Sequence, residues 1–307
     1  MLANNNEAII NKLAKNSVKT NKKQYAILFF TIILSAFMLF CVFTIGMTYL
    51  DSSRLQNTRL NGAEYDILTM NGFTSEQLNT LRQNENIRSV GIESYAGFIQ
   101  STEYDKTVEI GLLWCDEVFW DNLMSPARTK LDGHYPQNKN ELMVTKDILK
   151  TCGNENLSVG DSLILTYENN TGVYTDEFII SGIWDGYGDT SAGFVSKAFY
   201  DETGYDLKND GILCIKLNRN YVFPATIQSI EKSLDFSDRQ IFAPTGYIEN
   251  SFKLLLGICG LALVICLSAY LLIYNILYLS VSGKIRYYGL LQSLGMTKKQ
   301  LVHFIIK

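Results

Sequence analysis

Two long stretches without a charged side chain constrain this chain more than any other feature. Residues 25–50 and 254–283 contain no Asp, Glu, Lys or Arg. A helix of 26 residues, the length of the shorter stretch, is about 39 Å long and can cross a hydrocarbon core of about 30 Å. We therefore predict two transmembrane helices with the bounds of these stretches.

The distribution of charge predicts the orientation of the chain. Residues 1–24 carry five lysines against Glu7, and residues 284–307 carry five basic residues and no acidic one. Loops rich in Lys and Arg remain on the cytoplasmic side, so both termini are predicted to be cytoplasmic. Residues 51–253 carry 17 Lys and Arg against 30 Asp and Glu, a formal net charge of −13. We predict that they form an extracytoplasmic domain.

A cleavable signal peptide is the alternative for the first stretch. Its apolar region would have about 7–15 residues and would end at a cleavage site with small residues, whereas this stretch is longer and ends in MTYL. We therefore favour a span. Within residues 1–24, apolar and small residues recur at helical spacing, which predicts an amphipathic helix on the inner membrane surface: Ile10, Leu13, Ala14, Ser17 and Val18. An unstructured basic tail is the alternative here.

Alternating strands and capped helices predict a mixed α+β outer domain. Strands are expected at 64–70, 87–100 and 107–114, with a helix from 74 to 85 that begins at the capping box Thr74–Gln77. The pattern returns as a strand at 211–217, a helix at 223–234 and a strand at 239–243. The two units together predict a split βαβ sandwich, since each alone has too few strands to bury a face. Residues 131–205 are predicted to be a small, β-rich inserted subdomain.

The residues that catalysis requires are scarce. The chain has no phosphate-binding G-x-x-x-x-G-K-[ST] loop, no C-x-x-C pair and two histidines, so we predict no ATP hydrolysis, no metal site and no cofactor in this chain. Its composition also excludes a charge-dominated nucleic-acid binder. Three cysteines of the outer domain, Cys115, Cys152 and Cys214, allow at most one disulfide, and their state is left open.

Residues 284–300 form the most informative segment. We predict that the second helix continues through Lys284 and Arg286, and that Gly289 and Gly295 are break points. Between them, an apolar stripe is predicted from Leu290, Leu291 and Leu294. A capping box, Thr297-x-x-Gln300, starts a helix whose apolar residues 301–307 are predicted to begin a third span. The short amphipathic helix that carries Leu290, Leu291 and Leu294 would offer its apolar face to a cytoplasmic partner. The alternative interpretation of residues 284–300 is a solvated juxtamembrane linker without a partner.

Four pieces of the sequence resemble one family when taken in order. Residues 288–300, YGLLQSLGMTKKQ, resemble the cytoplasmic signature of FtsX/MacB-type ABC transporter permeases. Residues 132–144, 159–165 and 178–183 resemble consecutive pieces of that family's extracytoplasmic core. Each piece alone is short, but together with the order span, domain, span they cover nearly the whole chain.

The resemblance implies a permease subunit that is not itself catalytic. A separate ABC ATPase would bind ATP and Mg²⁺, and its hydrolysis would move the outer domain for export, lipoprotein or peptide handling, or mechanotransmission. The residues implied to contact this ATPase are Arg286, Tyr288, Gly289, Leu290, Leu291, Leu294, Gly295, Met296, Thr297, Lys298 and Gln300. Further expected partners are membrane lipid, a second copy or second permease half, and an extracytoplasmic peptide or protein cargo, but no nucleic acid. The expected location is a bacterial cell membrane, with several passes.

Two departures from the family bear on this interpretation. Many members carry Glu where Tyr288 stands, so an acidic contact with the ATPase is not expected. Members also continue with third and fourth spans, so the chain is expected to be a truncated product or the first half of a longer permease. The alternative function is a two-span membrane receptor with an extracytoplasmic ligand-binding domain. A membrane-anchored extracellular enzyme ranks third, because no catalytic constellation is found.

Overall fold

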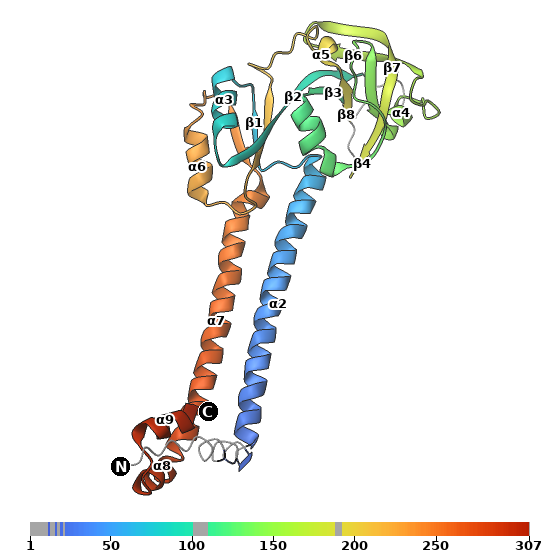
Figure 1. The fold of residues 1–307 in the computed structure, drawn as a ribbon. Helices are drawn as coiled ribbons and strands as arrows, with labels where there is room; N and C mark the ends of the chain where they lie inside the picture. Colours follow the sequence, from blue (N-terminus) through green and yellow to red (C-terminus); the bar gives the residue numbers. More distant parts are fainter. Residues whose placement is uncertain are drawn as a thin grey trace. The chain divides into compact units, whose positions relative to one another are not determined.

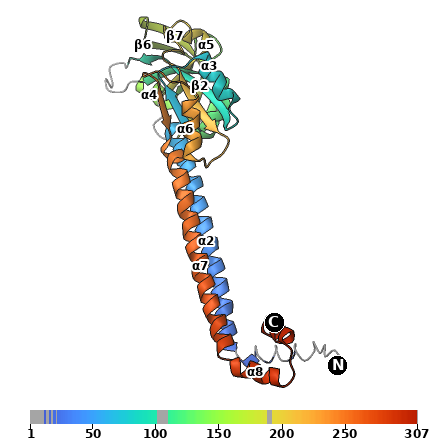
Figure 2. The same ribbon diagram turned by 90° about the vertical axis from the view of Figure 1, so that its left-hand side faces the viewer.

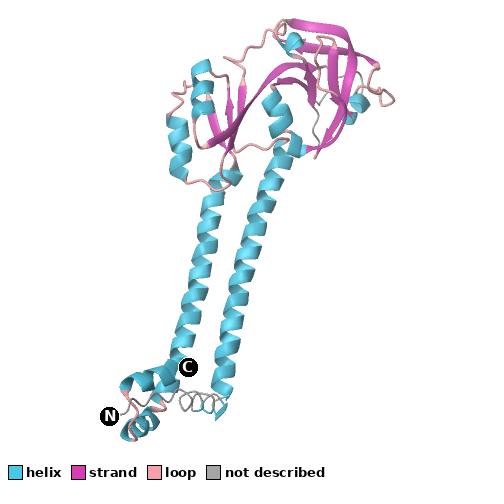
Figure 3. Ribbon diagram, in the orientation of Figure 1, coloured by secondary structure: helices cyan, strands magenta, loops and turns pink. Residues whose placement is uncertain are grey.

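The computed structural model describes residues 12, 16, 19–20, 22–100, 110–187 and 192–306. The chain divides into two compact units, an outer domain, Tyr49–Leu255, and a helical unit, Met1–Thr48 with Leu256–Lys307. The amphipathic helix predicted within residues 1–24 lies mostly outside the described residues. Figure 3 shows helices in the helical unit and a strand-rich outer domain.

Two long helices have the length and apolar composition of membrane spans. Helix α2 covers Lys22–Asn61 and α7 covers Gly246–Ser282. Two short helices follow α7, α8 at Ile285–Ser293 and α9 at Lys298–Ile306. The two predicted apolar spans and the mixed α/β domain are thus confirmed as elements of the fold.

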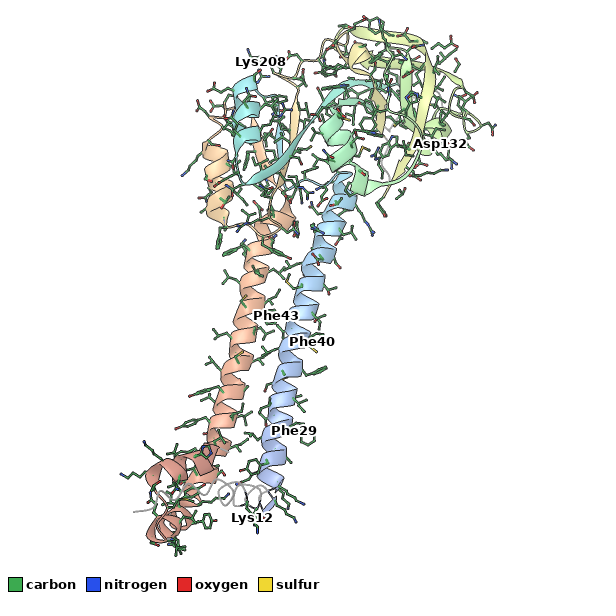
Figure 4. All side chains as sticks on the ribbon, in the orientation of Figure 1. Lys12, Phe29, Phe40, Phe43, Asp132 and Lys208 are labelled. Carbon is green, nitrogen blue, oxygen red and sulfur yellow. The ribbon has the colours of Figure 1, made fainter. Side chains whose placement is uncertain are left out.

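Helices α2 and α7 lie side by side in both views (Figures 1 and 2). The less exposed positions of each helix recur every three or four residues, which is the spacing of a single contact stripe. In the part of each helix that belongs to the helical unit, they are Leu28, Thr31, Ser35, Leu39, Cys41 with the adjacent Val42, and Gly46 in α2, and Ile258, Ala262, Ile265, Ala269, Ile273, Ile276 and Ser280 in α7. Phe29 and Phe40 lie on other faces of α2 and are more than half exposed (Figure 4). The apolar surface outside the stripe suits contact with lipid.

The outer domain contains one ten-stranded sheet. Its strands are β1 (Ile67–Met70), β2 (Ile87–Ile99), β3 (Ile110–Cys115), β4 (Arg128–Gly133), β5 (Glu141–Thr145), β6 (Ser162–Asn169), β7 (Gly172–Gly186), β8 (Ala192–Val195), β9 (Ile212–Leu217) and β10 (Ile241–Pro244). Their order is β10-β1-β9-β2-β3-β8-β5-β7-β4, and β6 pairs with both β2 and β7. The pairs β2-β3, β3-β8, β8-β5, β5-β7, β7-β6 and β6-β2 therefore close a ring of six strands.

This closed ring refines the predicted inserted subdomain. The insertion is β-rich as predicted, but it shares β2 and β3 with the first part of the domain and has no separate sheet. Gly97 allows the closure. Strand β2 shifts register between Tyr95 and Gly97, and Gly97 has a φ of 153°. A Cβ at Gly97 would lie 2.7 Å from the carbonyl oxygen of Glu168 in β6, so only glycine admits this approach.

Helices cover one face of the open part of the sheet. Helix α3 (Ser75–Gln83) and α6 (Pro224–Lys232) lie beside each other there (Figures 1 and 2). The capping box predicted at the start of α3 is confirmed, because the Gln77 N–H donates to Thr74 Oγ1 and the Thr74 N–H donates to Gln77 Oε1. A buried cluster that includes Leu81, Ile215 and Ile230 fills the space beneath the helices.

Several elements have no counterpart in the sequence predictions. They are the π-helix η1 (Val118–Leu123), the 3₁₀ turn η2 (Ser125–Ala127), strand β4, and the short helices α4 (Lys146–Thr151) and α5 (Lys197–Tyr200). In β4 five of the six side chains are exposed, so alternating hydrophobicity is absent. The helices have four to six residues, too few for a helical period to show.

Candidate functional site

The predicted coupling segment, residues 284–300, forms helix α8 and the start of α9. Arg286, Tyr288, Gly289, Leu290 and Leu291 lie in α8, and Leu294 is its C-cap. Gly295 and Met296 form the connection, Thr297 precedes α9, and Lys298 and Gln300 lie in its first turn. The structure therefore brings the predicted residues together in one helix–turn–helix segment.

Of the two predicted helix breaks, the one at Gly295 is observed and the one at Gly289 is not. Helix α7 stops at Ser282 and does not continue through Lys284 and Arg286, and Gly289 lies inside α8 instead of breaking it. A helix-interior glycine costs only about 1 kcal/mol relative to alanine, so the rest of α8 can hold Gly289 in the helix. The break occurs instead at Gly283 and Lys284, where the apolar stretch ends.

The turn after α8 has the hydrogen bonds of a Schellman motif. Gly295 has a φ of 98°, its N–H donates to Gln292 O at 3.0 Å, and the Met296 N–H donates to Leu291 O at 3.1 Å. This conformation favours glycine at position 295. The side chains of Leu291 and Met296 are half-buried. Leu291 thus lies in the last turn of α8, where its carbonyl takes part in the Schellman motif. Its side chain is half-buried and does not belong to an exposed apolar stripe, in contrast to the prediction.

The capping box predicted at Thr297 is confirmed. The Thr297 N–H donates to Gln300 Oε1 at 3.0 Å, and the Gln300 N–H donates to Thr297 Oγ1 at 3.4 Å. These two bonds satisfy amide groups at the start of α9 that have no partner within the helix. The turn between α8 and α9 is thus fixed at both ends by local hydrogen bonds.

The exposed apolar face of the segment consists of Tyr287, Leu290 and Leu294. Their exposed fractions are 44%, 60% and 76%. They lie at i, i+3 and i+7, which places them on one side of a helix. Tyr287 was absent from the predicted site, although its spacing from Leu290 is a signal that could have identified it. We call Tyr287, Leu290 and Leu294 the coupling face.

Tyr288 faces a different environment from the coupling face. Burial raises the pKa of its phenol, and the nearby Tyr25 and Tyr287 add to this effect. Tyr25 lies near the start of α2, so Tyr288 is on the side of α8 that approaches α2. Tyr288 is half-buried and therefore contributes to packing within the helical unit.

A second cluster lies in the outer domain and was missed by the sequence analysis. Lys216 in β9 is 5% exposed, and its Nζ lies 3.1 Å from Glu64 Oε1 and 3.3 Å from Asp66 Oδ2. The carboxylate of Asp66 also accepts the Leu217 N–H at 2.9 Å. Burial raises the pKa of Asp66, while the charge of Lys216 and the Leu217 N–H act in the opposite direction. The sequence signal that could have identified this cluster was a lysine within an otherwise apolar strand.

The backbone of Asp66 links the chain segments that lead to both long helices. Its N–H donates to Ile215 O at 2.9 Å, and its carbonyl accepts the Thr245 N–H at 2.8 Å. Asp66 follows the last residue of α2 by five positions, and Thr245 immediately precedes α7. We call Glu64, Asp66 and Lys216, with these backbone bonds, the junction cluster. It connects the exit of α2, the entry of α7 and the central strand β9.

The six cysteines are all within the described part of the chain and are all unpaired thiols. Cys115, Cys152 and Cys214, whose state was open, therefore form no disulfide. Burial raises the pKa of the Cys115 and Cys214 thiols well above the usual range, which keeps both neutral. Among the described residues, no group of three or more His, Cys, Asp or Glu side chains could hold a metal ion.

Comparisons with known proteins complete this description. No family model matches the sequence, and no curated protein matches it. Among solved structures, the chain is similar to the periplasmic region of MacB from Actinobacillus actinomycetemcomitans. The identity is 12% and the TM-score 0.41, over 63% of this chain and 95% of that structure.

The chain is also similar to the extracellular domain of YknZ, a noncanonic ABC-type transporter from Gram-positive bacteria. Here the identity is 12% and the TM-score 0.37, over 58% of this chain and 98% of that structure. At these identities the similarity is one of fold and assigns no role to an individual residue.

Proposed function

We propose that this chain is the permease subunit of an ABC transporter, coupling ATP hydrolysis by a separate ATPase to movement of its outer domain. The observation that carries the proposal is the coupling face, which is apolar, exposed and held on a segment whose turn is fixed by a Schellman motif and a capping box. The order of span, outer domain and span and the four sequence resemblances support it.

The charges around the coupling face indicate the chemistry of the partner. After Glu249 the chain has no acidic residue, while Lys284, Arg286, Lys298 and Lys299 surround the segment. A partner with an apolar groove and an acidic rim would complement this surface. In the proposed complex, that partner is the ATPase, and it binds the ATP and Mg²⁺.

The proposed transmission is a hinge movement and not conduction through a pore. Displacement of α8 by the ATPase would pull on α7, which is continuous from Gly246 to Ser282. Asp66, which follows α2, is hydrogen-bonded to Ile215 of β9 and to Thr245, which precedes α7. A displacement of the helices would therefore move the sheet as one body. Residues 25–50 and 254–283 contain no charged side chain that could form an ion path.

The lysine distribution supports an arrangement with both termini in the cytoplasm and the domain outside. The apolar residues of α9 are proposed to begin a third span. A second copy or a second permease half would complete the membrane unit, and a peptide or protein would be the cargo.

The proposal is tested by co-purification of the full chain with the ABC ATPase encoded beside it. We expect the unmodified chain to retain the ATPase, and the variant with Leu290→Asp and Leu294→Asp to lose it while still inserting into the membrane. Both changes place a charge on the coupling face. ATP hydrolysis by the complex in lipid nanodiscs gives a second readout and should fall in parallel.

A matched control carries Gln292→Asp and Ser293→Asp, which add the same two charges at exposed positions outside the coupling face. This variant should retain the ATPase. Equal loss in both double variants would show that added charge, and not the coupling face, controls binding. Failure of the unmodified chain to bind would favour the two-span receptor.

A further inference from the structure

A polar cavity of about 430 Å³ lies in the outer domain, where α3 begins and α6 ends. Three segments distant in sequence line it, and Lys208, labelled in Figure 4, marks this end of the domain. The lining residues are Asn71, Thr74, Glu76, Gln77, Thr80, Lys208, Asn209, Ser233, Leu234, Asp235, Ser237, Arg239 and Gln240. Its volume falls within the range of small-molecule sites, roughly 300–1,000 Å³.

The walls of the polar cavity are fixed by a network of amide groups. Gln77 Nε2 donates to Leu234 O at 2.8 Å and to Gln240 Oε1 at 3.1 Å. Gln240 Nε2 donates to Gly72 O at 2.8 Å. These bonds join the start of α3, the end of α6 and the segment before β10, so the shape of the cavity is set without a ligand.

Backbone strain is concentrated at the same place. Asn71, with a φ of 66°, and Asp235, with a φ of 43°, are the two residues other than glycine with positive φ in the described ranges. Both line the polar cavity. Such conformations persist only where the surroundings hold them, and they cluster at functional sites.

The charged side chains of the lining are balanced, and Glu76 lies in the first turn of α3. The start of α3 carries partial positive charge, and the end of α6 carries partial negative charge. Lys208 and Arg239 add two cations, and Asp235 and Glu76 add two carboxylates. None of these four groups forms an ion pair within the part of the chain that the structure describes. In a domain of net charge −13, this lining has a formal charge of zero.

This balance selects the chemistry of the ligand. A simple anion would be repelled by Asp235 and Glu76, and a simple cation by Lys208 and Arg239. Leu234 is the one aliphatic residue of the lining and no aromatic residue contributes, which disfavours an apolar ligand. A molecule with one ammonium and one carboxylate group satisfies both kinds of charge.

We propose that the polar cavity binds a small zwitterion of the size of a di- or tripeptide. Its carboxylate would meet Lys208 and Arg239, and its ammonium group would meet Asp235 after the end of α6. The site uses only residues of the outer domain. It is thus independent of the coupling face, and failure of one proposal leaves the other standing.

The first test uses the unmodified full chain in lipid nanodiscs and trialanine as the probe. We expect calorimetric titration to show saturable binding of trialanine. The same peptide with an acetylated N-terminus and an amidated C-terminus has the same shape without the charges and should bind at least about tenfold more weakly, the ratio for loss of one charge-assisted hydrogen bond. Equal affinity for the two peptides, or no binding of trialanine at millimolar concentration, would overturn the proposal.

Variants then locate the site. Asp235→Asn keeps a residue that tolerates positive φ, and Arg239→Gln leaves the backbone carbonyl that accepts from Asn71 Nδ2 in place. Each should weaken trialanine binding at least about tenfold. Lys232→Gln, a change at an exposed position of α6 outside the lining, should leave binding unchanged. Trialanine binding that survives both cavity variants would place the peptide elsewhere and contradict the proposal.

Discussion

At the scale of single residues, Glu93 is a carboxyl group in an unusual environment. It lies in β2, opposite Cys115 of β3 on one side and Ile212 of β9 on the other. Burial raises the pKa of Glu93 to about 7, from an ordinary value of 4.5. Its charge also contributes to the raised pKa values of Tyr65 and Cys214.

This environment predicts a pH dependence of stability. Between the unfolded pKa near 4.5 and the folded pKa near 7, the folded state binds more protons than the unfolded state, so stability falls as pH rises. The stabilisation is complete below the unfolded pKa and is lost above the folded pKa. Because Glu93 keeps some solvent contact, we expect a loss on the order of 2 kcal/mol.

Glu93→Gln should remove most of this dependence, because the amide does not ionise. Urea unfolding of the full chain in detergent at pH 5 and pH 8, followed by tryptophan fluorescence, measures it. The three tryptophans, Trp114, Trp120 and Trp184, all lie in the outer domain. Glu231→Gln, at an exposed position of α6, should keep the dependence. An unchanged pH profile in Glu93→Gln would contradict this account.

The junction cluster predicts a large effect of one substitution. Lys216→Met should lower the free energy of unfolding of the outer domain by about 3–5 kcal/mol, because it leaves the buried Asp66 carboxylate without its cation. Adding Asp66→Asn should recover part of this loss, since the amide oxygen can still accept the Leu217 N–H. The same tryptophan-detected unfolding measures both. Strictly additive losses would show that the two side chains are not coupled.

At the scale of elements, the approach of α2 and α7 depends on Gly46. A Cβ at this position would lie 2.6 Å from Cδ1 of Ile258 in α7. Gly46→Ala should therefore destabilise the helical unit by about 1–3 kcal/mol, and Ile258→Ala in the same chain should relieve the clash. Thermal unfolding in detergent, followed by circular dichroism, measures the effect.

Gly257→Ala is the matched control for this helix contact. Gly257 also lies in α7, but a Cβ there would meet nothing within 4 Å. Because alanine is about 1 kcal/mol more favourable than glycine inside a helix, this variant should be as stable as the unmodified chain or more so. If both alanine variants behave alike, helix propensity and not the contact with Ile258 decides the outcome.

Elements with a strong local pattern could be predicted, and elements without one could not. The capping boxes at Thr74 and Thr297 were predicted because both partners lie within four positions in the sequence. The break between α7 and α8 was predicted at the wrong position. Glycine is common at helix ends, but Gly289 lies inside α8 and does not have the positive φ of Gly295.

At the scale of the whole molecule, the two apolar spans, the mixed outer domain between them and most of its strands could be predicted from the sequence alone. These features follow from the distribution of charge and from hydrophobic periodicity, both of which are local. They were also sufficient to predict the segment that carries the coupling face, since Leu290, Gly295 and Thr297 lie within eight residues.

Contacts between residues that are distant in the sequence became known from the folded structure. Lys216 and Asp66 are 150 positions apart, and β6 closes the ring of six strands against β2 through residues about 70 positions away. The polar cavity likewise assembles three separate segments. Such long-range pairings cannot be predicted from local sequence. A buried lysine could pair with any acidic residue, and a strand with any free strand edge, so the folded structure alone shows which partner is used.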